Sequence, residues 1–239
     1  MPWLFEPFPV AALPLSDSDC QFAVQRIWCV GRNYATHTRE MGADPDRDPP
    51  FFFAKPASAL VFAAAASAAQ PTQVPYPVAT ADLHHEVEMV IALGQASDRH
   101  PDSDPLGWIA GLAVGIDLTR RDLQADLKTR SLPWEMAKAF DHSAIVGAIG
   151  RPPLAKFLAS KPKVSLHVND QQRQVGDIGE MIWPVADLLR HLAALVQLHP
   201  GDLVFTGTPA GVGPLQRGDR VHAEVVGLPR ICFEINALL

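Results

Sequence analysis

Cysteine is scarce in this sequence, and its arrangement excludes several kinds of protein. The 239 residues include three cysteines, Cys20, Cys29 and Cys232, which are scattered and form no CxxC pair. Neither a disulfide framework nor a zinc site built on thiolates is therefore expected, and a reducing, cytoplasmic location is predicted. The N-terminal stretch has no basic region, which argues against a signal peptide.

Long apolar runs and excess positive charge are also missing. The longest apolar stretch, residues 59–69, is rich in alanine and too short to cross a bilayer, so no membrane partner is expected. The formal net charge is −6. Because nucleic acids attract clustered Lys and Arg, no nucleic-acid partner is expected. The hydrophobic share of 48% is that of a globular protein with a substantial core.

The middle of the chain alternates between strand-like and helix-like patterns. Residues 83–93 alternate apolar and polar side chains, which predicts a strand with one buried face. The apolar run 109–116 predicts a strand that is buried on both faces. Thr119 and Asp122 resemble a capping box, which would open a helix that continues to about Arg130.

The second half of the chain is mostly of β type. Asn169 and Asp170 fit a hairpin turn, and residues 220–226 alternate as a strand does. An amphipathic helix is expected after Pro184, with its apolar face formed by Leu188, Leu189, Leu192, Leu195 and Val196. No repeat or linker divides the chain. We therefore predict one mostly β domain over residues 1–239, a barrel or sandwich rather than a parallel α/β sheet.

Three carboxylates form the first candidate site. Glu86 and Glu88 are two apart on the predicted strand, so their side chains leave the same face with Cα atoms about 6 to 7 Å apart. Asp117 ends the buried strand 109–116. A cation relieves the repulsion between such carboxylates, and a set of oxygen ligands favours Mg²⁺, Mn²⁺ or Ca²⁺ over Zn²⁺. The alternative is a solvated polar face.

A second candidate site lies in a predicted helix over residues 34–41, with Asn33 as its N-cap. His37 and Glu40 are three apart and share a face of this helix. A carboxylate bonded to one ring nitrogen raises the basicity of the other, which makes a general base for water. The polar, proline-rich residues 44–50 that follow fit a lid over a site. The alternative is a surface ion pair.

Cationic and amide side chains follow Asp117 at helical spacings. Arg121, Gln124 and Lys128 stand at i+4, i+7 and i+11, so the first two at least can face a ligand of Asp117 and suit a substrate carboxylate. They also fit a solvated helix face. Lys138 lies between apolar residues, and a buried lysine needs an anionic partner or a function. The alternative is a surface lysine whose ammonium reaches the solvent.

These segments together resemble the fumarylacetoacetate hydrolase family, in particular its short acylpyruvase-like members. The similar stretches follow the family order and cover nearly the whole chain. They are GRNYATHTREMG (31–42), FFFAKPASAL (51–60), LHHEVEMVIALG (83–94), GLAVGIDLTRRDLQ (111–124), PWEMAKAFD (133–141), VNDQQRQ (168–174) and LVFTGTPAGVGPLQRGD (203–219).

The resemblance implies a fold and a set of site residues. The fold is mostly β (α+β), a rolled mixed sheet or barrel with a few short helices, like the C-terminal domain of fumarylacetoacetate hydrolase, usually in a homodimer. The implied metal ligands are Glu86, Glu88 and Asp117, for Mg²⁺ or Mn²⁺, with Ca²⁺ possible in a crystal. The implied catalytic residues are His37 and Glu40, on a lid of about residues 33–50, and Lys138. The implied substrate contacts are Lys55, Arg121, Gln124 and Thr208.

The resemblance also implies a reaction. We expect hydrolysis of a carbon–carbon bond in 2,4-dioxo acids of the acylpyruvate type, such as fumarylpyruvate or acetylpyruvate, as in aromatic catabolism. The same enolate chemistry leaves two enzymatic alternatives. They are decarboxylation or tautomerisation of oxaloacetate, and isomerisation of 2-hydroxyhepta-2,4-diene-1,7-dioate. Outside enzymes, the alternative is a protein with a structural metal site.

Overall fold

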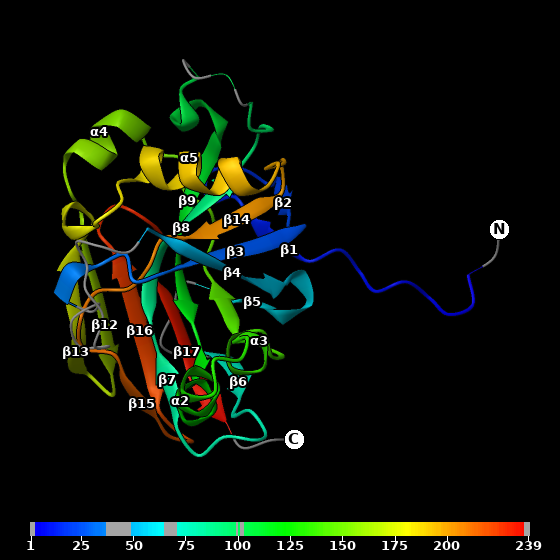
Figure 1. Ribbon diagram of the computed structural model, residues 1–239, viewed down its shortest axis with the longest axis vertical. Coiled ribbons are helices and arrows are strands. Elements are labelled where there is room, and N and C mark those ends of the chain that lie inside the picture. The colour runs from blue at the N-terminus through cyan, green and yellow to red at the C-terminus, as the bar shows by residue number, and fades with distance from the viewer. Residues whose placement is uncertain (1–2, 37–48, 65–70, 99, 101–102, 237–239) are drawn as a thin grey trace.

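Two large sheets form the body of the molecule (Figure 1). The computed structural model describes residues 3–36, 49–64, 71–98, 100 and 103–236. The seven-stranded sheet has the order β4 (Phe51–Pro56), β3 (Arg26–Gly31), β14 (Asp202–Phe205), β8 (Val87–Leu93), β9 (Ile109–Asp117), β11 (Ala144–Val146), β5 (Leu60–Phe62). The five-stranded sheet has the order β13 (Gln171–Asp177), β12 (Lys163–Val168), β16 (Arg220–Val225), β17 (Ile231–Asn236), β6 (Thr72–Pro75).

Smaller elements complete the described fold. A three-stranded sheet joins β10 (Thr119–Arg120), β7 (Leu83–His85) and β15 (Gly213–Leu215), and β1 (Ala12–Pro14) pairs with β2 (Gln21–Ala23). The α-helices are α2 (Arg121–Thr129), α3 (Glu135–Lys138), α4 (Leu154–Ala159) and α5 (Val185–Leu195). The 3-10 helices are η1 (Ala57–Ala59), η2 (Pro105–Trp108) and η3 (Ile178–Glu180). None of the helices within the described residues has the length and apolar content that a membrane crossing requires.

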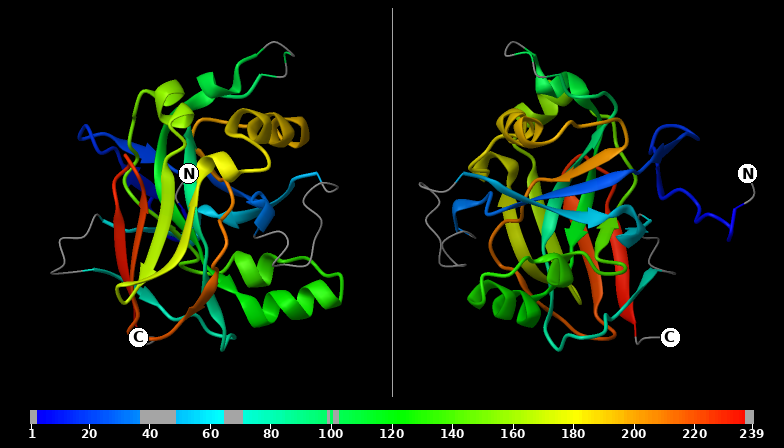
Figure 2. Two further views of the ribbon diagram at one scale, coloured as in Figure 1. Left: turned by 90° about the vertical axis from the view of Figure 1, so that its left-hand side faces the viewer. Right: turned by 45° about the vertical axis from the view of Figure 1, so that its right-hand side comes forward.

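The helices lie at opposite ends of the sheets. In all three views α5 crosses one end of the seven-stranded sheet, whereas α2 and α3 lie at the other end (Figures 1 and 2). The seven-stranded sheet is mixed, because β14 runs parallel to β3 and antiparallel to β8. The prediction of a mostly β fold with a rolled mixed sheet and a few short helices is confirmed.

The core lies on both faces of the central strand β8. Met89 and Ile91 belong to the apolar cluster that includes the inward side chains of β12 and β16. Val90 and Ala92 point the other way, into a second cluster with Phe205 of β14. The prediction of a strand with one buried face is therefore wrong, because both faces of β8 are covered. The predicted strand is also interrupted at Glu86, between β7 and β8.

The expected capping box is wrong as well. Thr119 lies in the short strand β10, and α2 begins two residues later, with Arg120 at its N-cap and no side-chain cap. The Thr119 hydroxyl instead accepts a hydrogen bond from Lys138 Nζ at 2.7 Å. The Asp122 carboxylate accepts one from the Thr80 hydroxyl at 2.6 Å. Both side chains therefore serve tertiary contacts.

The predicted hairpin and the late amphipathic helix are present. Asn169 and Asp170 have φ values of 49° and 64° and connect β12 to β13, as a tight turn with two left-handed residues requires. In α5, Leu188, Leu189 and Leu192 are buried, as expected. Leu195 is 68% exposed, so the buried face ends before the last turn.

Gly115 gives the first testable prediction. A Cβ atom at this position would lie 2.5 Å from Val90 Cγ2 and 2.8 Å from Phe205 Cε1. We expect Gly115→Ala to lower the free energy of unfolding by about 1 to 3 kcal/mol, as overpacking does, measured by urea denaturation. The control is Gly107→Ala, because nothing lies within 4 Å of that Cβ position. Equal stability of the two variants would contradict this account.

Candidate active site

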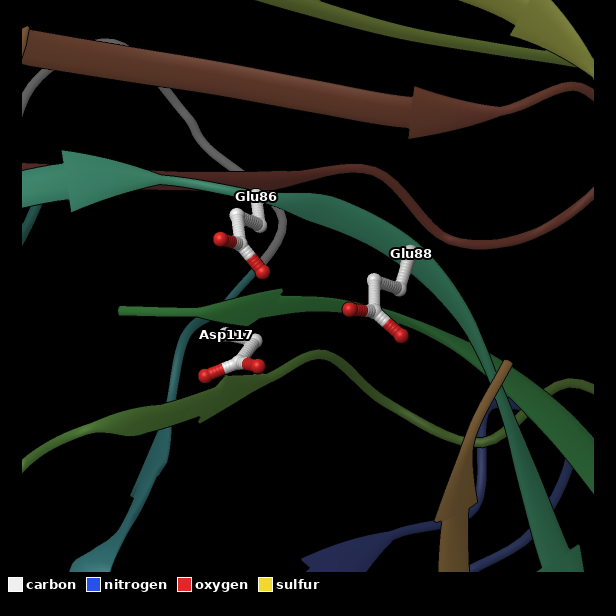
Figure 3. A group of neighbouring side chains, drawn as sticks. All are labelled: Glu86, Glu88 and Asp117. Carbon is white, nitrogen blue, oxygen red and sulfur yellow. The ribbon is translucent and has the colours of Figure 1, made fainter. Parts of the chain in front are cut away.

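Glu86, Glu88 and Asp117 converge at one end of β8 and β9. In Figure 3 the three carboxylates turn toward one another from the two neighbouring strands. Val87 pairs with Ile116, and the Asp117 amide donates to the Glu86 carbonyl oxygen at 2.9 Å. The three side chains therefore leave the same face of the sheet, and one oxygen of each lies within 4.8 Å of the others. All three are buried.

The buried Gln174 side chain holds the junction between β7 and β8, where Glu86 lies. Gln174 Oε1 accepts hydrogen bonds from His85 Nδ1 at 2.8 Å and from the Val87 amide at 3.1 Å. Its Nε2 donates to the Thr208 hydroxyl at 2.8 Å and to the Pro209 carbonyl oxygen at 2.9 Å. Burial lowers the pKa of His85 to about 4, so the ring is neutral. Gln174 thus links β13 to the β7–β8 junction beside Glu86 and to the loop that carries Thr208.

Three cations face Glu86 and Asp117. Lys138 Nζ donates to Glu86 Oε2 at 2.8 Å and to Asp117 Oδ2 at 2.7 Å. Lys55 Nζ lies 2.8 Å from Asp117 Oδ1, and an Arg121 amino group lies 2.5 Å from Glu86 Oε1. Although burial opposes its charge, Asp117 and then Glu86 raise the pKa of Lys138. The cluster is therefore balanced in charge by residues of β4, α2 and α3.

Within the described residues, no ion pair with a cation reaches Glu88. One oxygen accepts a hydrogen bond from the Gly207 amide at 2.5 Å. Burial raises the pKa of Glu88 well above its usual range, and the charges of Asp117 and Glu86 raise it further. Gly207 is suited to this place because its φ is +94° and a Cβ atom would lie 2.8 Å from Asn33 Cβ.

The residues present fit a hard divalent cation. The cluster offers three carboxylates and, within the described residues, no cysteine or histidine belongs to it. Oxygen donors of this kind suit Mg²⁺ or Mn²⁺ better than Zn²⁺. The raised pKa of Glu88 reflects its burial first and then the repulsion by the neighbouring Asp117 and Glu86 carboxylates, and a cation at this place would offset that repulsion.

Glu86 and Glu88 open onto a cavity that several predicted residues line. Glu86, Glu88, Arg121, Gln124, Lys128, Lys138 and Thr208 all contribute to its wall. Arg121 also donates to Gln124 Oε1 at 2.5 Å. Lys55 is not in this lining. It lies behind the site, where its ammonium contacts Asp117 and donates to the Leu118 and Lys138 carbonyl oxygens.

Some features of the site were not predicted from the sequence. Arg32, Phe51, Phe53 and Trp134 also line the cavity, although the stretches that carry them were used only for the resemblance. Gln174 is fully buried, and nothing in the hairpin pattern distinguishes it from Gln171 or Gln172. His37 and Glu40, and most of the predicted lid 33–50, lie outside the described residues. Their roles stay a prediction.

Comparison with known proteins establishes the family. Residues 26–236 match the model of the fumarylacetoacetate hydrolase C-terminal domain. The chain belongs to the fumarylacetoacetate hydrolase family.

Named relatives in this family carry out different reactions. A fumarylpyruvate hydrolase from Pseudomonas aeruginosa, solved in complex with Mn²⁺ and pyruvate, is 42% identical, with a TM-score of 0.91 over 99% of this chain and 100% of that one. The oxaloacetate tautomerase of Escherichia coli (strain K12) is 38% identical over 84% of this chain and 88% of its own length. A 5-carboxymethyl-2-hydroxymuconate delta-isomerase from Mycobacterium smegmatis is 27% identical, with a TM-score of 0.76 over 90% and 80% of the two chains.

The raised pKa of Glu88 predicts how metal affinity depends on pH. A cation must displace the proton that the raised pKa holds on Glu88, so affinity should fall as pH falls through that pKa. We expect a slope of up to about tenfold per pH unit for one displaced proton, measured by calorimetry with Mn²⁺ from about pH 8 to about pH 5.5.

Two variants control this measurement. Glu88→Gln removes the titrating group, so both the affinity and its pH slope should decrease. Glu234→Gln removes a carboxylate of β17 and should leave both unchanged. An affinity independent of pH in the unmodified protein would refute the assignment of Glu88 as a ligand.

Proposed function

We propose that the chain is a divalent-metal-dependent hydrolase that cleaves a carbon–carbon bond in acylpyruvates. The observation that carries this proposal is the carboxylate cluster on the wall of a cavity that Arg121, Gln124 and Lys138 also line. The resemblance to a fumarylpyruvate hydrolase that binds Mn²⁺ and pyruvate supports it. Mg²⁺ or Mn²⁺ is the proposed cofactor, held by Glu86, Glu88 and Asp117.

The cation, when bound, supplies Lewis acidity toward the carboxylate and the 2-oxo group of a pyruvyl substrate. Arg121 and Gln124 are placed to hold the substrate carboxylate from the α2 side of the cavity. The Lys138 ammonium carries the positive charge that favours an enolate oxygen at C2. Thr208 adds a hydroxyl to the cavity wall, positioned by its hydrogen bond from Gln174.

Water supplies the nucleophile in the proposed reaction. His37, oriented by Glu40, takes a proton from water, and the hydroxide adds to the C4 carbonyl carbon. The C3–C4 bond then breaks, its electron pair forms the enolate of pyruvate, and the acyl group leaves as a carboxylic acid. A proton added at C3 completes pyruvate. A positioned general base contributes typically about 10²- to 10⁴-fold to such a rate.

A second candidate function is tautomerisation of oxaloacetate. The similarity to the oxaloacetate tautomerase of Escherichia coli supports it, and the similarity to a delta-isomerase supports isomerisation of a related dienoate. Decarboxylation of oxaloacetate would use the same enolate. These reactions add no water, so they have less need of a His37–Glu40 base. The predicted dyad is our reason to prefer hydrolysis.

A purely structural metal site is the least favoured alternative. A structural ion is enclosed by protein ligands, whereas Glu86 and Glu88 line a cavity together with four cationic side chains, Arg32, Arg121, Lys128 and Lys138. This arrangement suits an anionic ligand next to the cation.

The cysteines of the chain are free thiols, which suits the cytoplasm as the proposed compartment.

Substitutions at two positions separate metal binding from water activation. We expect Glu86→Gln to lose both metal binding and hydrolysis, because it removes a ligand charge. His37→Ala should lose about 10²- to 10⁴-fold in kcat while its metal affinity stays within about threefold of the unmodified protein. Calorimetry with Mn²⁺ and a spectrophotometric assay with acetylpyruvate and oxaloacetate give the two readouts.

The exposed His199→Ala variant controls for the loss of an imidazole. Loss of metal affinity in His37→Ala would contradict the division of roles. Oxaloacetate tautomerisation that persists without any acylpyruvate hydrolysis would favour the second candidate function.

We infer that the protein partner is a second copy of this chain, in a homodimer. Residues 3–10 form an arm that projects away from the sheets, as Figure 1 and the right-hand view of Figure 2 show. Its large apolar side chains, Trp3, Leu4, Phe5, Phe8 and Val10, are between 71% and 97% exposed. Aromatic side chains at this exposure favour burial in an interface. Reciprocal exchange of two identical arms satisfies twofold symmetry.

The arm can be tested by light scattering after size-exclusion chromatography. The unmodified chain should elute as a dimer, and the triple variant Leu4→Ser, Phe5→Ser, Phe8→Ser should shift toward monomer at micromolar concentration. A matched triple variant at exposed apolar residues elsewhere, Val78→Ser, Leu195→Ser, Val226→Ser, should remain dimeric. A monomeric unmodified chain would refute the dimer, and a dimeric arm variant would refute the contact.

A further inference from the structure

Three side chains that can bind a transition metal form a row across the five-stranded sheet. His167 of β12 is the register partner of His222 of β16, and His222 is in turn the register partner of Cys232 of β17. Residues directly opposite one another on neighbouring strands point to the same face of a sheet. The two imidazoles and the thiol are therefore neighbours on one face.

That face is turned away from the apolar core. The sequence neighbours of the row, among them Leu166, Ala223 and Phe233, are buried in the core cluster on the other side of the sheet. Nor does any member of the row line the cavity of the carboxylate cluster. The row is therefore separate from the proposed active site.

The thiol and one imidazole already have a spacing close to that of two metal ligands. Cys232 Sγ lies 3.8 Å from His222 Nε2. A tetrahedral Zn²⁺ holds nitrogen at about 2.0 to 2.1 Å and sulfur at about 2.3 Å, which places two such ligand atoms about 3.6 Å apart. The Cys232 amide donates to the Ala64 carbonyl oxygen, away from β16. The pair with His222 is thus of the non-hydrogen-bonded type, in which opposite side chains approach most closely.

The donor atoms of the row select a different class of cation from that of the carboxylate cluster. Imidazole nitrogen and thiolate sulfur suit Zn²⁺ and its d-block neighbours, whereas carboxylates suit Mg²⁺ and Mn²⁺. On binding, the S–H bond of Cys232 breaks, a metal–sulfur bond forms and the proton passes to the solvent. The His222 Nε2 lone pair supplies the second bond.

His167 is placed to supply a third bond. Across the part of the chain that the structure describes, its ring makes no hydrogen bond. Its imidazole and that of His222 are partly exposed, so a cation can enter from the solvent, whereas Cys232 is only 2% exposed. Among the described residues, only the carboxylate cluster has three ligand atoms within 4.8 Å of one another. His167 therefore turns toward the other two when the cation binds.

The carboxylates nearest to the row already have partners. Glu224 pairs with Arg230 at 2.9 Å, and Glu234 pairs with Arg220 at 3.5 Å. These pairs leave the cation to nitrogen and sulfur ligands, with a water molecule as the fourth ligand of a tetrahedron.

We propose that His167, His222 and Cys232 form a second metal site, for Zn²⁺ or a similar d-block cation, on the outer face of the five-stranded sheet. The cation joins β12, β16 and β17, so it stabilises the sheet at a distance from the cavity. No CxxC pair marks this site in the sequence, since each ligand stands alone on its own strand. The site does not depend on the proposed hydrolysis.

Co²⁺ is a spectroscopic probe for the thiolate ligand, because a cobalt–thiolate bond gives an intense charge-transfer band in the near ultraviolet. With excess Mg²⁺ present for the carboxylate cluster, one equivalent of Co²⁺ per chain should produce this band, and Zn²⁺ should abolish it by displacement. Cys232→Ser should remove the band. His222→Ala and His167→Ala should each weaken Co²⁺ binding by at least about tenfold, since even the loss of an outer-shell partner costs that much.

Two matched variants control this titration. Cys20→Ser removes an exposed thiol and His199→Ala an exposed imidazole, and both should keep the band and the affinity. Absence of the band from the unmodified protein, or its persistence in Cys232→Ser, would overturn the site. Unchanged affinity in His167→Ala would overturn the assignment of three ligands on three strands.

Thermal unfolding gives a second readout that needs no substrate. In excess Mg²⁺, a hundredfold excess of free Zn²⁺ over its Kd should raise Tm by about 5 to 10 °C. Glu88→Gln should keep this rise, because its substitution lies in the carboxylate cluster, whereas His222→Ala should lose it. A rise that survives in His222→Ala would refute the site. Failure of acylpyruvate hydrolysis would leave both readouts unaffected, so the two proposals are tested separately.

Discussion

The burial of three like charges is the constraint on which the rest of this structure depends. Each buried carboxylate carries a desolvation cost of several kcal/mol, which only paired charges and hydrogen bonds can offset. Lys138 and Arg121 meet Glu86, and Lys138 and Lys55 meet Asp117. These cations come from β4, α2 and α3, which are separate in the sequence. The ion pairs of the site therefore hold these elements together. Removing one cation would leave an unmatched charge in the interior.

The fold meets this constraint through the alternation of β8. Glu88 shares a face with Val90 and Ala92, on the side of the second apolar cluster, and Glu86 stands at the break that precedes the strand. Gly115 lies across from Glu88 and leaves room for the Phe205 ring. Gln174 ties the break to the loop that carries Thr208. The two large sheets are thus coupled at the site by one amide side chain as well as by their apolar core.

The sequence predicted the features that depend on local spacing. The i, i+2 separation placed Glu86 and Glu88 on one face and Asp117 stood at a strand end, and the family resemblance then implied that the three form one ligand set. The hairpin at Asn169 and Asp170 depends on two residues that tolerate positive φ. The features that failed depend on distant partners. Thr119 resembles a cap only until Lys138 is placed beside it, and the burial of Gln174 follows from the packing of segments far apart in the chain.

Lys55 and Lys138 are linked in a way that affects how mutational data on this family member are read. The Lys55 ammonium bonds the backbone carbonyl oxygen of Lys138 and also contacts Asp117, yet it does not line the cavity. Replacing it would disturb the short helix α3 and the ion pairs of its neighbour together. A loss of turnover after such a replacement resembles the loss of a reacting group, although it reflects the alignment of another lysine. Scanning mutagenesis alone would therefore overcount the groups that touch the substrate.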